Sequence, residues 1–256
     1  MVLTLVAIVV AIAAAVRSTW SPCGLSMLAT VTPLAERGRG YRYRSTAAWF
    51  VLGSVAGGAT LGAAMAVLAV GIHALALSPL VVGIVATAAA VVAAGSDADV
   101  GGHQLPVHHR QVNERWLDRF RPWVYGAGFG WQIGTGLATY IMTAAVYLTI
   151  VLGALTGSPL AALATALVFG LVRGVAVLLG RRITTPEALV AFHRRFFELG
   201  RTVGTITLVV EATAVVALAW LVSPWAAVVL ALAFGATAVV RIAGRRRGSA
   251  ATVAAR

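Results

Sequence analysis

The sequence predicts an all-α polytopic membrane protein with about seven transmembrane helices. Its residues are 60% hydrophobic and only 11% charged, and the mean hydropathy is +0.90. A soluble domain is usually about 45–50% apolar and about 25% charged. The chain also divides into apolar runs that are each close to or longer than the ~20 residues needed to cross a bilayer. Those runs span residues 2–34, 46–74, 78–95, 123–155, 158–180, 202–222 and 224–243.

The distribution of arginine predicts how these spans are oriented. All 20 basic residues are arginine, and almost all of them fall in the connectors after the first, third, fifth and seventh runs. The three connectors between these carry none. The positive-inside rule makes the arginine-rich side cytoplasmic. We therefore expect a protein of the cytoplasmic (inner) membrane, with its N-terminus outside and its C-terminus inside. Because the net charge of +12 is an orientation signal, no nucleic acid is expected as a partner; the expected partner is the lipid bilayer.

The first run is predicted to be a broken helix. No basic residue precedes the apolar stretch 2–16, as a secretory signal peptide would need, so we interpret that stretch as the outer half of the helix. Pro22 and Gly24 flank Cys23, the only cysteine in the chain. Such a break at membrane depth is tolerated where the freed backbone lines a cavity. Cys23 is therefore the candidate reactive residue, or else a small buried apolar side chain.

A similar break is predicted in the fourth run. Gly134, Thr135 and Gly136 align with the segment around Cys23, and both segments continue into apolar sequence with threonines. The following span in each half carries glycines four residues apart, a spacing that lets helices approach closely. Runs one to three and four to six therefore look like two copies of one three-helix unit. An odd number of spans places the copies in opposite orientations, the inverted-repeat plan of many transporters.

These features divide the chain into four parts. Residues 1–95 form the first repeat, 96–122 a cytoplasmic loop, 123–222 the second repeat, and 223–256 an extra span with a basic cytoplasmic tail. The two breaks are expected to face each other near the bilayer midplane. Pro22, Gly24, Gly134, Thr135 and Gly136 would then line a substrate site.

Two ionisable residues lie inside later spans. Arg173 and Glu211 are at similar predicted depths, so we expect them to form an intramembrane charge pair. An intramembrane charge is costly and marks a functional site by default. The pair is either a structural salt bridge between two helices or an anion or proton site. Arg17 either points toward Cys23 or extends to an interface.

The two long cytoplasmic connectors have different expected structures. The first contains Asp and His residues between 97 and 109; these side chains can bind a transition metal, but their spacing fits no metal motif and a solvated loop is the alternative. The second reads as an amphipathic helix, 185–199, on the inner membrane surface. Thr185 caps it, Pro186 begins it and Gly200 ends it.

Ser21-Pro22-Cys23 in a long first helix, a glycine-rich break in the fourth and the three-plus-three plan resemble the CcdA/DsbD family of membrane thiol–disulfide carriers. LysE-type exporters are more distant relatives. In that family, paired cysteines in the first and fourth helices pass reducing equivalents from a cytoplasmic thioredoxin-like protein to outer thiol proteins, as in cytochrome c biogenesis. Cys23 matches the first cysteine, and Thr135 stands at the position of the second.

The resemblance implies thiol-linked redox transfer across the membrane through Cys23. Two alternatives stay open: transport of a small solute or ion through the same inverted-repeat core, and a scaffold with a redox-inactive site. No nucleotide-binding loop, catalytic triad or zinc-binding HExxH pattern is present, so any enzymatic activity would be thiol–disulfide exchange. No cofactor and no metal are expected.

Overall fold

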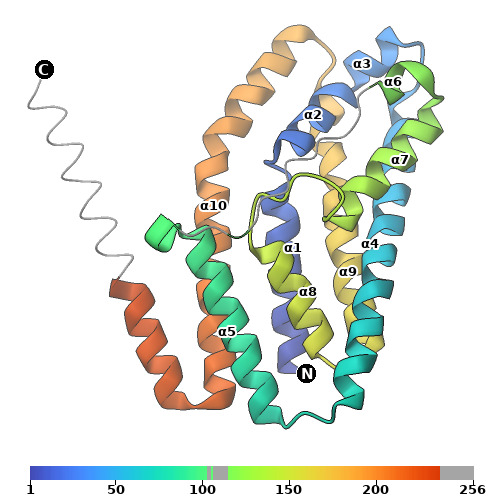
Figure 1. Cartoon of the computed structure of the whole chain (residues 1–256). Helices are drawn as coiled ribbons and strands as arrows, with labels where there is room; N and C mark the ends of the chain where they lie inside the picture. Colours follow the sequence, from blue (N-terminus) through green and yellow to red (C-terminus); the bar gives the residue numbers. More distant parts are fainter. Residues whose placement is uncertain (103–104, 106–114, 237–256) are drawn as a thin grey trace, which may run out of the picture.

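The computed structural model describes residues 1–102, 105 and 115–236, and every regular element within them is a helix (Figure 1). The helices are α1 (Val2–Ser18), α2 (Pro22–Thr30), α3 (Pro33–Gly38), α4 (Tyr43–Ala74), α5 (Pro79–Asp97), α6 (Trp116–Arg119), α7 (Pro122–Thr135), α8 (Ala145–Leu155), α9 (Pro159–Val175) and α10 (Pro186–Val222). Two 3₁₀ segments, Val100–Gly102 and Ala176–Arg182, and a last helix, Pro224–Ala236, complete the described part.

Four of these helices are long and apolar enough to cross a membrane. They are α4, α5, α9 with its 3₁₀ extension, and α10; α1 and α2, bent by 65° at their junction, together make a fifth. A membrane protein follows from this composition, but seven spans do not. The fourth predicted run is divided into α7 and α8, which are 14 and 11 residues long. The seventh run is described only as far as Ala236, as the helix Pro224–Ala236.

Hydroxyl side chains followed by proline begin many of the helices. In each case the serine or threonine oxygen accepts the backbone N–H three residues later, which satisfies one of the free donors of the first turn. Proline suits the next position because it has no N–H to leave unpaired. The capping residues are Ser21, Thr32, Ser78, Ser158 and Thr185.

The two broken segments run in opposite directions (Figure 1). The N-terminus lies at the same end of the molecule as the α4–α5 and α8–α9 turns, while α3, α6 and the first turns of α4 and α7 lie at the other end. α1 thus occupies one half of the bundle and α2 the other; α7 and α8 take the two halves in the reverse order. α1 and α8 are in direct contact.

α4 is the central helix, and glycine allows its neighbours to reach its backbone. A Cβ atom at Gly53 would collide with the carbonyl of Ala127 in α7. At Gly134 of α7 or Gly170 of α9, a Cβ would collide with the carbonyl of Ser54. The expected close approach through small residues is therefore confirmed for α4 against α7 and α9. This packing fixes the positions of the second break and of Arg173.

The predicted surface helix 185–199 is not separate from the sixth span. Gly200 does not end it, because α10 continues without interruption to Val222. The glycine instead makes room for Trp20: a Cβ at Gly200 would lie 3.1 Å from the Trp20 ring. Trp20 also stacks on Phe196 at 4.4 Å and donates its indole N–H to the Phe196 carbonyl at 2.7 Å. These contacts join the first break to α10.

Candidate functional site

The first break is a tight, buried turn. α1 ends at Ser18, and the Thr19 hydroxyl donates to the Ala15 carbonyl at 3.1 Å. Ser21 then accepts the Gly24 N–H at 3.2 Å and so caps α2. A Cβ at Gly24 would collide with the Thr19 carbonyl. Glycine is therefore required where α2 folds back on the turn, which explains the Pro-Cys-Gly sequence. Pro22 itself is exposed.

A cavity of about 20 Å³ lies where α2, α4, α7 and α9 meet. Gly24 and Met27 of α2, Phe50 of α4, Ile133 of α7 and Arg173 of α9 are among its lining residues. A water molecule needs about 10–15 Å³ measured in this way, so the cavity has room for one. The cavity brings the first break together with the helix that leads into the second.

Arg173 is the charged residue of this cavity. Its side chain is 3% exposed, and its guanidinium carbon lies 5.9 Å from the centre of the Phe169 ring. The Nη2 atom is buried and has no hydrogen-bond partner. Cys23 is an electrostatic neighbour of the guanidinium. Arg173 therefore has a hydrogen-bond donor available for an anion or a thiolate. Binding one is favourable because an unsatisfied buried cation is costly.

Cys23 is also buried, at 1% exposure. It belongs to an apolar cluster that includes Met27 on α2, Ile133 on α7 and Val177 after α9. The predicted reactive residue therefore lies beside the cavity on the buried face of α2, packed toward α4 and α7. Any reaction with another thiol requires α2 to move.

The residues of the second break, Gly134, Thr135 and Gly136, are not among the lining residues of the cavity, contrary to the prediction. α7 ends at Thr135, and Gly136 follows with a left-handed backbone (φ 70°) that a residue with a Cβ rarely adopts. The Thr135 hydroxyl donates to the carbonyl of Gln132 at 2.8 Å. Gly134 packs on α4, and Gly136 packs on the Phe169 ring. Ile133, rather than Thr135, is thus the α7 residue that faces the cavity.

Arg173 and Glu211 do not form the predicted charge pair. Arg173 lies at the cavity, whereas Glu211 lies on α10, fully buried, with Asp97 as its electrostatic neighbour. No ion pair joins the two side chains, and neither Glu211 carboxylate oxygen has a hydrogen-bond partner. Similar depth along two helices placed them together in the sequence prediction, but depth does not specify which face of each helix they occupy.

Asp97 is the end of α5 and not part of a solvated loop. Its carboxylate accepts the Ala144 N–H at 2.6 Å and the Thr143 hydroxyl, at the start of α8. Arg17 of α1 is an electrostatic neighbour of Asp97 and packs on α10 at Gly204; it does not line the cavity near Cys23.

In the part of the chain that the structure describes, no cluster of possible metal ligands occurs. The predicted loop histidines, His103, His108 and His109, lie outside the described residues.

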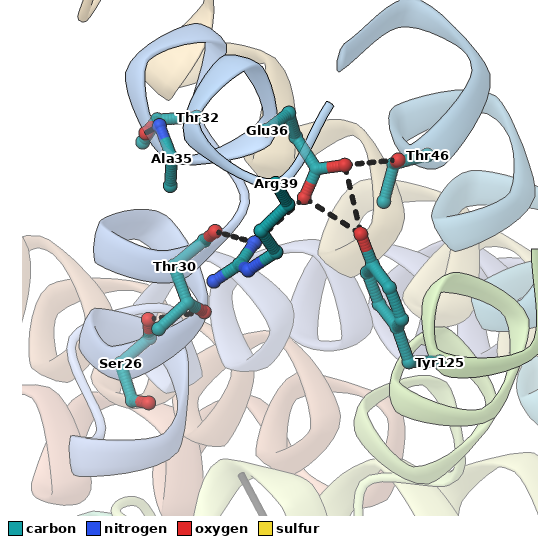
Figure 2. A network of polar contacts seen from close by, with 8 residues as sticks. All are labelled: Ser26, Thr30, Thr32, Ala35, Glu36, Arg39, Thr46 and Tyr125. Atoms are coloured by element: carbon teal, nitrogen blue, oxygen red, sulfur yellow. Dashed lines mark hydrogen bonds and ion pairs between the residues drawn. The ribbon is translucent and has the colours of Figure 1, made fainter. Parts of the chain in front are cut away.

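A buried polar network at the arginine-rich end escaped the sequence analysis (Figure 2). The Glu36 carboxylate accepts the Thr46 hydroxyl at 2.6 Å and the Tyr125 hydroxyl at 2.8 and 2.9 Å. Arg39 pairs with Glu36 at 2.9 Å and also donates to the Thr30 carbonyl at 3.0 Å. The network thereby ties the α2–α3 segment to α4 and α7. A signal was present: Glu36 is the one acidic residue in a connector full of arginines.

Comparison with known proteins gives relatives but no family model and no solved structure. The chain is 32% identical to the methylamine utilization protein MauF of Paracoccus denitrificans over 64% of this chain and 59% of that protein. It is 28% identical to MauF of Methylophilus methylotrophus over 86% of this chain and 78% of that protein. The match to the MauF proteins of the two Paracoccus species spans about three-fifths of their length.

Proposed function

We propose that this chain is a membrane-embedded thiol carrier that exchanges disulfides through Cys23. The observation that supports this best is the position of Cys23 next to Arg173, a buried cation with an unused donor. The thiolate is the nucleophile in thiol–disulfide exchange, and neighbouring arginine is one of the features that stabilise it. The glycine-dependent turn at Gly24 holds the cysteine at this place.

A single cysteine is sufficient for such a carrier if its partners are dithiol proteins. The Cys23 thiolate attacks the disulfide of an outer protein; that S–S bond breaks, and one sulfur leaves as a thiolate that takes up a proton. An incoming thioredoxin-like dithiol then attacks Cys23 and releases the outer protein fully reduced. The second thiol of the incoming protein finally displaces Cys23. Two electrons and two protons pass from the dithiol to the disulfide, and Cys23 returns to its starting state.

The arrangement of the broken helices supports access to Cys23 from more than one side. α1–α2 and α7–α8 run in opposite directions (Figure 1), as two inverted three-helix repeats require. In this proposal the repeats comprise residues 1–95 and 123–222, and the arginine-rich end faces the cytoplasm. α2 moves away from the cavity to admit a partner, and the Glu36 network holds it closed at the cytoplasmic end.

The relatives give the proposal a biological setting. They are called methylamine utilization proteins, so we propose that this chain serves the use of methylamine or of a related amine. Within that setting, a thiol carrier in the cytoplasmic membrane would act on a protein outside the membrane whose cysteines must change redox state.

The same cavity supports one alternative, which is transport of a small anion or solute. The free Arg173 donor is a ligand for an anion, and the cavity lies between broken helices, where transporters place their substrates. A volume of about 20 Å³ fits one water, so transport would require a larger opening than thiol exchange. A redox-inactive scaffold would use neither Cys23 nor Arg173.

Trapping experiments on the full chain in its own membrane distinguish these functions. Cells are quenched with acid, free thiols are blocked, and disulfide-linked partners of the chain are separated on a non-reducing gel. A thiol carrier gives a linked species that disappears on reduction and in Cys23→Ser. Absence of any linked species in cells, also when the resolving thiol of a candidate thioredoxin-like partner is replaced by serine, contradicts the proposal. Protection of Cys23 from a permeant maleimide by a solute instead favours transport.

A further inference from the structure

Glu211 is a buried acid that the proposed thiol chemistry does not use. Its side chain is fully buried where α10 packs against α5 and α1, and neither carboxylate oxygen has a hydrogen-bond partner. Taking an ionised carboxylate into an apolar interior without donors or a cation is very unfavourable, so such a group takes up a proton. Glu211 is therefore a candidate proton-binding group.

The charges around Glu211 come from the two helices packed against α10. α5 contributes Asp97, the electrostatic neighbour of Glu211. α1 contributes Arg17, which lies against α10 at Gly204 and interacts with Asp97. Asp97 also accepts the Ala144 N–H and the Thr143 hydroxyl. Burial opposes the charged form of both carboxyl groups, but the hydrogen bonds and the nearby cation favour it at Asp97 alone, so Asp97 is the more easily ionised of the two.

We propose that Glu211 and Asp97 form an intramembrane proton-binding site, in which Glu211 carries the proton and Asp97 is a fixed negative charge. The two carboxyl groups differ because Asp97 has donors and Glu211 has none. Neither residue lines the Cys23 cavity, so the site is separate from the thiol chemistry and does not depend on it.

The site is coupled to the second break through Asp97. This carboxylate accepts the N–H of Ala144, the residue just before α8, and the Thr143 hydroxyl, directly after the chain emerges from the break. When Glu211 loses its proton, two negative charges face each other beside this helix start. Their repulsion opposes the packing of α10 against α5. Proton release and a rearrangement of the second break therefore go together.

The ligand is a proton and not a metal ion. Within the described residues, no third histidine, cysteine or carboxylate joins Asp97 and Glu211 to complete a ligand set. The Arg17 guanidinium already supplies positive charge next to Asp97, which disfavours a further cation. Proton binding needs only one oxygen, and Glu211 offers two.

Infrared spectroscopy of the full chain in lipid vesicles tests the proposal without requiring a reagent to reach the site. A protonated carboxyl group gives a C=O stretching band that an ionised carboxylate lacks. We expect this band in the wild-type protein at neutral pH, a shift of the band in heavy water, and its loss in Glu211→Gln. Glu36→Gln is the matched control: Glu36 is equally buried but has Arg39, Thr46 and Tyr125 as partners, so its replacement leaves the band unchanged.

Titration then tests the role of Asp97. Raising the pH removes the Glu211 band, and in Asp97→Asn the band disappears at a pH lower by at least about one unit, because the neighbouring negative charge is gone. Spectra of wild type and Glu211→Gln that agree in this band between about pH 5 and pH 9 overturn the proposal. Loss of the band on exchange of choline chloride for sodium chloride at constant pH overturns the assignment to protons. An unchanged titration in Asp97→Asn overturns the pairing.

Discussion

At the scale of residues, the buried polar groups divide into those with partners and those without. Glu36 has three partner side chains, and Ser54 donates its hydroxyl to the Gly170 carbonyl at 2.7 Å. Arg173 and Glu211 have buried polar atoms with no partner. Native proteins satisfy most buried polar groups, so each exception needs an explanation. Arg173 and Glu211 are the charged exceptions among the described residues and lie at the two proposed sites, whereas the other buried atoms without a partner are the Ser18 and Thr139 hydroxyls and His193 Nε2.

Replacing Arg173 tests its effect on Cys23. In Arg173→Gln the thiolate loses its cationic neighbour, and we expect Cys23 to react about tenfold more slowly with methyl methanethiosulfonate at neutral pH, which corresponds to about 1.4 kcal/mol. Arg173→Lys retains the charge and most of the rate. The rate is measured at one fixed pH in the wild type and in both variants. A wild-type rate in Arg173→Gln would contradict the role of Arg173.

Arg173 and Glu211 are expected to act independently. Each has its own electrostatic neighbour, Cys23 for one and Asp97 for the other. Effects of residues that share no partner add to within about 0.5 kcal/mol. We therefore expect the double variant Arg173→Gln, Glu211→Gln to change the free energy of unfolding by the sum of the single changes, as measured by unfolding in mixed micelles. A double variant that loses much less unfolding free energy than the sum of the single variants would support the ion pair that the sequence predicts.

At the scale of elements, the α2–α3 segment is the movable part of the site. α2 carries Cys23 on its buried face, and it is joined to α1 through a 65° bend. Its far end is held by the Arg39 contact to the Thr30 carbonyl and by the link from Glu36 to α4 and α7 (Figure 2). Exposure of Cys23 therefore depends on how firmly this network closes.

Tyr125→Phe weakens the network without removing its charges. A hydrogen bond to a charged group contributes about 1.5–3 kcal/mol, so local opening and the maleimide labelling of Cys23 should rise by about tenfold to a hundredfold. Tyr41→Phe is the control, since Tyr41 is half-exposed near the same connector. Unchanged labelling in Tyr125→Phe, at wild-type stability, would show that the network does not control access to Cys23.

Cysteine cross-linking tests which residue of α7 faces the first break. Ile133 lies in the same apolar cluster as Cys23 and lines the cavity, whereas the Thr135 side chain bonds its own helix. A disulfide needs Cα atoms about 4.4–6.8 Å apart, and a short bifunctional thiol reagent extends that reach. We expect Ile133→Cys to cross-link to Cys23 faster than Thr135→Cys. The reverse order would support the repeat alignment that the sequence predicts.

At the scale of the whole molecule, composition predicted the class, and the positions of proline and glycine predicted the break near Cys23 and the end of α7 near Gly136. These follow from local chemistry: proline and glycine interrupt helices wherever they occur. The surroundings of the Arg173, Glu211 and Thr135 side chains could not be predicted. They depend on how each helix is rotated about its axis, and the packing of α4 against α7 and α9 sets that rotation. Glu36 was not singled out because the four arginines of its connector were interpreted only as an orientation signal.

The arrangement of the helices predicts that the α4–α5 turn and the end of the 3₁₀ segment after α9 lie on opposite sides of the membrane. Ser78 and Arg182 are exposed and mark these two places. Figure 1 shows the start of α5 and the end of α9 at opposite ends of the bundle. Between them the chain crosses three times if α7 and α8 together count as one crossing. It crosses only twice if these short helices return to the side from which they enter.

Single cysteines Ser78→Cys and Arg182→Cys are introduced into Cys23→Ser and labelled with a membrane-impermeant maleimide. We expect Ser78→Cys to be labelled in intact cells and Arg182→Cys only after the membrane is opened, since arginine-rich connectors face the cytoplasm. Equal labelling of both in intact cells would mean that α7 and α8 form a re-entrant pair, and the inverted-repeat plan would then fail for the second half of the chain.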